Sequence, residues 1–231
     1  MLQFNKLTVT KESAMGGNVF KQKTQRINLE DINPTIDWLE SITSLELHSN
    51  IIGSVGKKSS SGDLDMVIDE KNKSVLIEKL NSWVTSNGFL LNEYLRKSGD
   101  NVHFLTPIKG DAKNGYVQTD FMISNDPIWI KFSMYSEGDG SKYSGADRNK
   151  FLSALAKCKG FKYSWKNGLS DRSTGEFITK NPDDISNLIL GTNSNTLMSV
   201  ETINDSLEHN EELTHLIILN DEIKPLLRFN N

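Results

Sequence analysis

Two aspartates, Asp63 and Asp65, stand between a loop of small residues and an apolar run. If residues 63–69 form a strand, residues two apart face the same way, so the two carboxylates share one face and Leu64 and Met66 fill the other. Neighbouring carboxylates raise each other's pKa unless a cation lies between them. Hard divalent ions such as Mg²⁺ bind oxygen ligands and usually share them with substrate phosphates. Although an isolated Asp-x-Asp is more often a solvated strand end, we interpret this pair as a candidate metal site because of the loop before it.

The loop before these aspartates, residues 53–62, is rich in glycine and serine and contains two lysines. Small residues, hydroxyls, free backbone N–H groups and lysines are the groups that bind a triphosphate. A P-loop is excluded, because that motif needs four residues between its glycines and Ser or Thr directly after its lysine. The loop therefore indicates phosphate binding of another kind, beside the carboxylates.

A third carboxylate lies in the segment 115–123. Its residues alternate, with apolar side chains and Thr119 on one face and Asp120 on the other. Burying an unpaired charge is expensive, so an aspartate in a β-rich apolar segment needs a partner. Opposite Asp63 and Asp65 on a neighbouring strand, where facing Cβ atoms lie about 5 Å apart, Asp120 would complete a cation site.

The elements that must position these residues follow from periodicity and turn signals. Helical spacing predicts one helix over residues 28–43 and another from residue 72 or 74 to about residue 86. Apolar and β-branched runs predict strands over residues 45–52, 89–96, 102–108, 115–123 and 129–135. Strands and helices mixed in this order indicate an α+β protein.

The carboxylate pattern resembles that of a known family. A Gly-Ser turn, a short loop, Gly-Asp-x-Asp-hydrophobic and a third aspartate on a later strand resemble the DNA polymerase beta-like nucleotidyltransferase superfamily. In family X polymerases an aromatic, a small hydroxyl residue and glycine follow the palm, and then a helix with an early asparagine and a late Lys-Gly-Phe. Here Tyr143-Ser144-Gly145, Asn149 and Lys159-Gly160-Phe161 look like that pattern. The likeness covers roughly residues 45–191 and is most similar to minimal or phage-type members.

The resemblance implies a nucleotidyltransferase palm with a mixed sheet, flanking helices and a C-terminal helical subdomain. It divides the chain into an N-terminal segment 1–44, a palm 45–140, a nucleotide-closing subdomain 141–195 and a helical appendage 196–231. Ser153 stands where vertebrate repair enzymes of the family place a template-sensing arginine, so template-directed fidelity is not implied.

The roles of the family's site residues can be assigned to individual residues of this sequence. The resemblance implies that Asp63, Asp65 and Asp120 are catalytic and bind two Mg²⁺ ions, with Mn²⁺ as a possible substitute. It implies that an NTP or dNTP binds to Gly53, Ser54, Lys57, Lys58, Ser61, Gly62, Ser144, Gly145 and Asn149.

Charge is unevenly distributed along the chain. Residues 141–172 contain eight Lys and Arg against two Asp, whereas residues 173–231 contain three against ten acidic residues. A basic block beside a carboxylate site is as consistent with a nucleic-acid footprint as with a solvated surface. The nucleic-acid-binding candidates are Arg148, Lys150, Lys157, Lys159, Lys162 and Arg172.

The favoured function is a small DNA polymerase or terminal transferase acting on a nucleic-acid 3′ end. One alternative is the same transfer to a protein, tRNA or small-molecule hydroxyl, and another is a non-catalytic binding module of the same fold. The pattern leaves open the acceptor, NTP against dNTP, and the oligomeric state.

Composition sets broad bounds. The chain has 231 residues, 36% hydrophobic and 24% charged, with a single cysteine, which excludes an internal disulfide framework. No apolar run reaches membrane-spanning length, so we expect a cytoplasmic protein without a membrane partner.

The four histidines, His48, His103, His209 and His215, lack metal-ligand spacing and are interpreted as structural or surface residues. Of the four tryptophans, Trp165 is the candidate for base stacking because it lies in the basic block.

Overall fold

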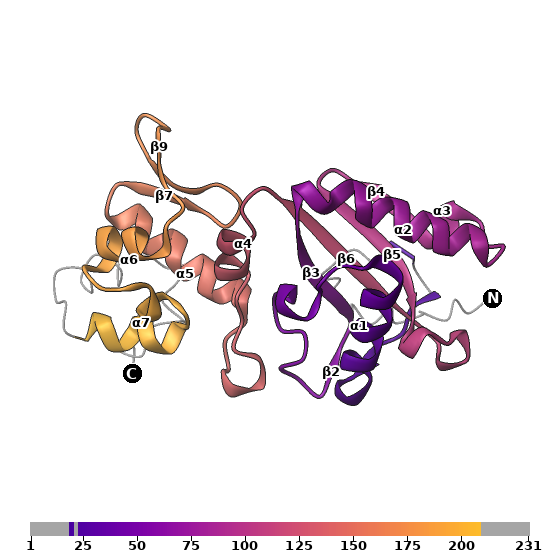
Figure 1. The fold of residues 1–231 in the computed structure, drawn as a ribbon. Coiled ribbons are helices and arrows are strands. Elements are labelled where there is room, and N and C mark those ends of the chain that lie inside the picture. The colour runs from indigo at the N-terminus through magenta and orange to yellow at the C-terminus, as the bar shows by residue number, and fades with distance from the viewer. Residues whose placement is uncertain (1–18, 21–22, 209–231) are drawn as a thin grey trace, which may run out of the picture.

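The computed structural model describes residues 19–20 and 23–208, and its architecture is α+β. Figure 1 shows two lobes side by side, one around a four-stranded sheet and one made of helices and a three-stranded sheet. Each lobe has its own buried apolar cluster. Much of the sequence-predicted N-terminal segment and of the C-terminal appendage, residues 1–18, 21–22 and 209–231, lies outside the described residues.

The sheet of the first lobe is mixed, as the sequence predicts. Its strand order is β3-β6-β5-β4, in which β3 and β6 are parallel and the other neighbours antiparallel. The strands are β3 (Asp63–Asp69), β4 (Leu95–Ser98), β5 (Asn101–Pro107) and β6 (Tyr116–Ser124). A short antiparallel pair, β1 (Ile27–Asn28) and β2 (Ser60–Ser61), joins the loop before β3 to the N-terminal side of the chain.

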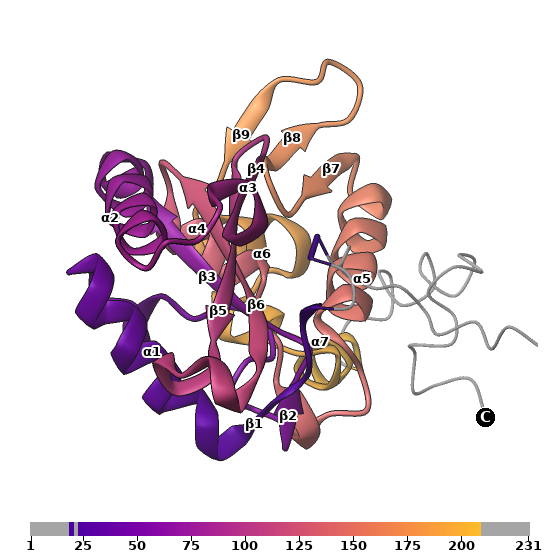
Figure 2. The ribbon, with the colours of Figure 1, turned by 90° about the vertical axis from the view of Figure 1, so that its right-hand side faces the viewer.

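One face of this sheet is covered by two helices, α1 (Leu29–Thr43) and α2 (Lys73–Ser86) (Figure 2). Their apolar stripes pack against the alternate strand residues such as Leu64, Met66 and Phe121. Alternation along β3 and β6 therefore leaves the aspartates on the other face, which the two helices do not cover. Both helices and the strands over 102–108 and 115–123 confirm the sequence predictions to within a few residues.

Three predicted strands are wrong or shortened. Residues 45–52 form no strand; a 3₁₀ turn, His48–Asn50, replaces it, because the Glu40 carboxylate accepts the N–H groups of Leu47 (2.5 Å) and His48 (3.1 Å). Much of the run 89–96 is a helical turn, α3 (Leu91–Tyr94).

The predicted strand over 129–135 is instead a helix, α4 (Pro127–Ser133). Asp126 accepts the Trp129 N–H at 3.0 Å, and Pro127 occupies the first helical turn, where its missing N–H costs nothing. A short apolar run does not by itself distinguish a buried strand from a buried helix, and here the cap selects the helix.

The second lobe packs around one core that α4 shares. It contains α5 (Gly145–Cys158), β7 (Phe161–Ser164), β8 (Gly168–Asp171), β9 (Phe177–Thr179), α6 (Pro182–Leu190) and α7 (Val200–Leu207). Val67 of β3, on the same face as Asp65, packs into this core. The lobes are therefore joined just beside the aspartates. Within the described residues, no helix has the length and apolar character needed to cross a membrane.

Candidate active site

Three aspartates meet on the sheet face that α1 and α2 leave uncovered. Asp65 of β3 lies directly opposite Asp120 of β6 in the parallel register, and Asp63 precedes Asp65 by two residues on the same face. Each offers a carboxylate oxygen within 4.8 Å of the others, and all three are partly buried. The predicted grouping of these three side chains is thus what the fold produces.

Burial and mutual repulsion perturb this cluster. Burial, followed by the charges of Asp63 and Asp120, raises the pKa of Asp65 from 3.8 to about 7. Burial and Asp120 also raise the pKa of Asp63, whereas the guanidinium of Arg26 lowers it. Arg26 is held beside the cluster by hydrogen bonds from Nε to Ser60 Oγ (3.1 Å) and from Nη2 to the Ser60 carbonyl (2.9 Å). Among the described residues Arg26 offsets part of this repulsion, yet the pKa of Asp65 stays raised, so a bound cation would stabilise the ionised cluster.

Asp120 is held in place at both of its oxygens. His103 Nδ1 lies 2.8 Å from Oδ1, and Gln118 Nε2 donates to Oδ2 at 3.0 Å. The Val19 N–H donates to Gln118 Oε1 at 2.8 Å, which orients the Gln118 amide. The carboxylate plane of Asp120 is therefore restrained before any ligand binds.

Sequence reasoning treated His103 as structural or surface and missed this contact. His103 faces Asp120 across β5 and β6, a register that local sequence does not specify. Gln118 could have been found, because its spacing of two from Asp120 places both on one strand face. The other described histidine, His48, pairs with Asp37 at 2.7 Å on the surface.

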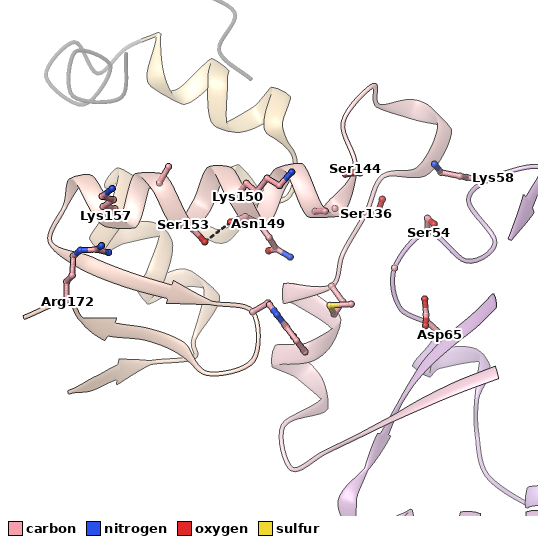
Figure 3. A pocket seen from close by; sticks show the side chains of 16 residues that line it. Ser54, Lys58, Asp65, Ser136, Ser144, Asn149, Lys150, Ser153, Lys157 and Arg172 are labelled. Carbon is pink, nitrogen blue, oxygen red and sulfur yellow. Dashed lines mark hydrogen bonds between the residues drawn. The ribbon is translucent and has the colours of Figure 1, made fainter. Parts of the chain in front are cut away.

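A cleft of about 880 Å³ opens between the lobes at this cluster (Figure 3). One wall contains Asp65 and the Gly53–Ser54 turn; the other is the N-terminal part and one side of α5. The turn is placed by pairing with β3, since the Ile52 N–H donates to the Asp65 carbonyl at 3.0 Å. Gly53 has φ +68°, and a Cβ there would lie 3.7 Å from Asp65 Oδ2, so the backbone passes close to the carboxylate.

Six of the nine predicted nucleotide-binding residues line this cleft. They are Gly53, Ser54, Lys58, Ser144, Gly145 and Asn149. Ser144 forms a capping box with Asp147 at the start of α5. A Cβ on Gly145 would lie 2.9 Å from the Tyr135 carbonyl oxygen, so the close approach of this turn needs glycine.

The remaining three lie outside the cleft wall. Lys57 Nζ donates to the Ser136 carbonyl at 2.5 Å and lies 4.0 Å from the centre of the Tyr135 ring, so it ties the loop to the segment between the lobes. Ser61 is buried in β2, and Gly62 packs against Arg26. Lys57 and Gly62 are exposed and Ser61 is buried, and none of the three lines the cleft, so their role as nucleotide contacts stays a prediction.

The predicted basic residues divide into three groups. Lys150 and Lys157 on α5 line the cleft together with Arg172, which directly follows β8 (Figure 3). Lys159 and Lys162 are exposed but not part of the cleft wall.

Arg148 is the exception, and its prediction as a nucleic-acid contact is wrong. Its side chain is buried and donates from Nε to the Leu197 carbonyl (2.5 Å) and from Nη1 to the Phe132 carbonyl (3.1 Å). It therefore fastens α4, α5 and the segment before α7 together, and cationic residues at the C-terminal end of a helix such as α4 are favourable.

Comparison of the sequence with protein-family models and with curated proteins finds no match. The site combines three clustered carboxylates, a Gly-Ser turn beside them, and a cleft lined by cationic side chains. This arrangement can hold divalent cations together with a phosphorylated ligand.

Proposed function

We propose that this protein is a metal-dependent nucleotidyltransferase with a DNA polymerase beta-like palm. It would transfer a nucleoside monophosphate from an NTP or dNTP to an acceptor hydroxyl and release pyrophosphate. The observation that carries the proposal is the cluster of Asp63, Asp65 and Asp120, whose member Asp65 lines one cleft together with the Gly53–Ser54 turn. A structural cluster would gain nothing from three ionisable carboxylates whose repulsion is only partly offset.

The donor set fits divalent cations. Asp63, Asp65 and Asp120 offer only oxygen ligands, which Mg²⁺ and Mn²⁺ prefer, and their atoms lie within 4.8 Å of one another. Two such ions, when bound, neutralise the phosphate charge and lower the pKa of the attacking hydroxyl.

The protein's own groups would bind and orient the substrates. The backbone N–H groups of the Gly53–Ser54 turn, the Ser54 hydroxyl and Lys58 would bind the triphosphate, and the turn at Ser144–Gly145 would support the sugar. Asp120, restrained by His103 and Gln118, would orient the acceptor hydroxyl and accept its proton. The bond from the α-phosphorus to the bridging oxygen breaks as the bond to the acceptor oxygen forms, and pyrophosphate leaves. Positioning and charge stabilisation account for most of the catalysis in such transfers.

The favoured acceptor is a nucleic-acid 3′ hydroxyl. Lys150, Lys157 and Arg172 line the same cleft as Asp65, where they can neutralise backbone phosphates. Transfer to a protein, tRNA or small-molecule hydroxyl is the alternative, and a non-catalytic binding module of the same fold is the other.

The test is a matrix of labelled NTPs and dNTPs against DNA, RNA and protein acceptors, with Mg²⁺ or Mn²⁺. We expect label on an oligonucleotide 3′ end. Each of the single substitutions Asp63→Asn, Asp65→Asn and Asp120→Asn should abolish transfer. Asp69→Asn is the matched control, because Asp69 lies on the same strand but bonds to Lys71 outside the cluster. Equal loss in the control, or no transfer to any acceptor despite nucleotide binding, would contradict the proposal.

The acceptor has a separate test. Lys157→Ala with Arg172→Ala should flatten the slope of log affinity against log salt for an oligonucleotide by roughly 0.7–0.9 for each lost phosphate contact. Lys159→Ala with Lys162→Ala removes the same charge outside the cleft and should change the slope less. Label on a protein acceptor, with equal slopes in both variants, would favour the alternative.

A further inference from the structure

Trp165 differs from the other tryptophans of this chain. Trp129 is buried, and Trp38 and Trp83 pack edge to face at 5.2 Å in the first lobe. Trp165 is 41% exposed and lines the cleft that contains Asp65. Single exposed apolar residues are common, so exposure alone assigns it no role.

The second observation is that the hairpin tip carrying Trp165 is tied down on two sides. Trp129 Nε1 donates to the Trp165 carbonyl at 2.7 Å, which fixes the tip to α4. The next residue, Lys166, donates from Nζ to Asp100 Oδ2 at 2.8 Å across to the first lobe. An aromatic ring on a fixed backbone loses little conformational entropy when a ligand stacks on it.

The third observation is the location of the ring. Two residues before it, the Tyr163 hydroxyl donates to Asn149 Oδ1 at 3.2 Å, so β7, the strand that leads to Trp165, borders the α5 wall. Trp165 also lines the adjoining cavity of about 550 Å³ together with Met122. Met122 follows Asp120 on the same strand face, roughly 7 Å along β6. Trp165 therefore lines the cleft that contains Asp65 and one side of α5, and also the adjoining cavity beside β6.

We propose that Trp165 is the stacking platform for the base of the incoming nucleotide. This inference rests on the proposed function and deepens it: the Gly53–Ser54 turn holds the phosphates while the indole holds the base, so a free nucleotide is bound at both ends without a template. Every nucleobase has a π-face, so such a platform accepts all four. An aromatic stacking partner of this kind contributes about 5- to 150-fold in affinity per base.

The experiment compares the affinity of ATP with that of inorganic tripolyphosphate, both with Mg²⁺ and without acceptor, by calorimetry. The wild-type protein should bind ATP about 5- to 150-fold more tightly than tripolyphosphate. Trp165→Ala should remove that difference and leave tripolyphosphate binding unchanged, and Trp165→Phe should retain part of it. Phe177→Ala is the matched control, since Phe177 is an exposed aromatic residue of the same lobe that does not line the cleft.

The outcomes distinguish failure of the Trp165 stacking platform from failure of the proposed function. Binding of tripolyphosphate with no advantage for ATP, or an advantage that survives Trp165→Ala, overturns the platform and leaves the proposed function intact. Weakened oligonucleotide binding with unchanged ATP affinity also overturns it, because the ring then serves the acceptor. Absence of binding for both ligands to the wild-type protein overturns the proposed function, and the inference with it.

Discussion

Replacing Asp65 by Asn should stabilise the metal-free protein at alkaline pH and not at acid pH. The carboxylate of Asp65 has a pKa raised to about 7 by burial and by its neighbours Asp63 and Asp120. A raised pKa means that the folded protein holds this proton more tightly than the unfolded chain does. The stability it contributes is therefore full below pH 3.8 and is lost as the pH rises through 7.

The size of the expected stabilisation follows from the difference between the ordinary pKa of Asp65 and its raised pKa. At 1.36 kcal/mol per pH unit, the span from 3.8 to about 7 corresponds to at most about 4 kcal/mol. The three carboxylates share the repulsion, so we expect Asp65→Asn to recover about 2–4 kcal/mol at pH 8.5 and close to nothing at pH 4. For a chain of this length, 1 kcal/mol is roughly 2–4 °C in Tm.

The assay is thermal unfolding by circular dichroism in a chelator, from pH 4 to pH 8.5, for the wild-type protein, Asp65→Asn and the control Asp69→Asn. The wild-type Tm should fall relative to that of Asp65→Asn as pH rises, and Mg²⁺ should restore much of the loss in the wild-type protein alone. A difference between the two proteins that does not depend on pH, or an equal effect in Asp69→Asn, would refute the assignment of a buried, repelling carboxylate at this position.

Three further predictions address the other parts of the site. Ser54→Ala combined with Lys58→Ala should raise the KM for nucleotide more than it lowers kcat, because phosphate contacts act in ground and transition states alike; an unchanged KM would remove the turn from the phosphate site. His103→Leu should lower kcat by about 10- to 100-fold while nucleotide affinity, measured by calorimetry, stays the same, because His103 positions Asp120 and lies behind it. Normal turnover would show that the contact is dispensable. Arg148→Met should lower the free energy of unfolding by roughly 3 kcal/mol, since hydrogen bonds to a charged group contribute ~1.5–3 kcal/mol each, and leave the salt dependence of oligonucleotide binding unchanged.

Local sequence was sufficient to predict the aspartate faces. Alternation along residues 63–69 and 116–124 determines which side chains share a side, because the side-chain period of a strand is two. The apolar spacing of α1 and α2 was readable for the same reason, since it depends on near neighbours. The three candidate carboxylates, and the loop residues Gly53, Ser54 and Lys58 that line the cleft, therefore came from sequence.

Tertiary structure decided what lies next to those residues. The pairing of Asp65 with Asp120 and of His103 with Asp120 depends on strand register, which long-range packing selects. Arg148 looks like any surface cation in the sequence, but three packed segments close around it. The cleft, and the exposure of Trp165 in it, arise from the way two separate cores are joined at Val67. The packing between the two cores depends on contacts between residues far apart in the chain, and no local sequence pattern encodes those contacts.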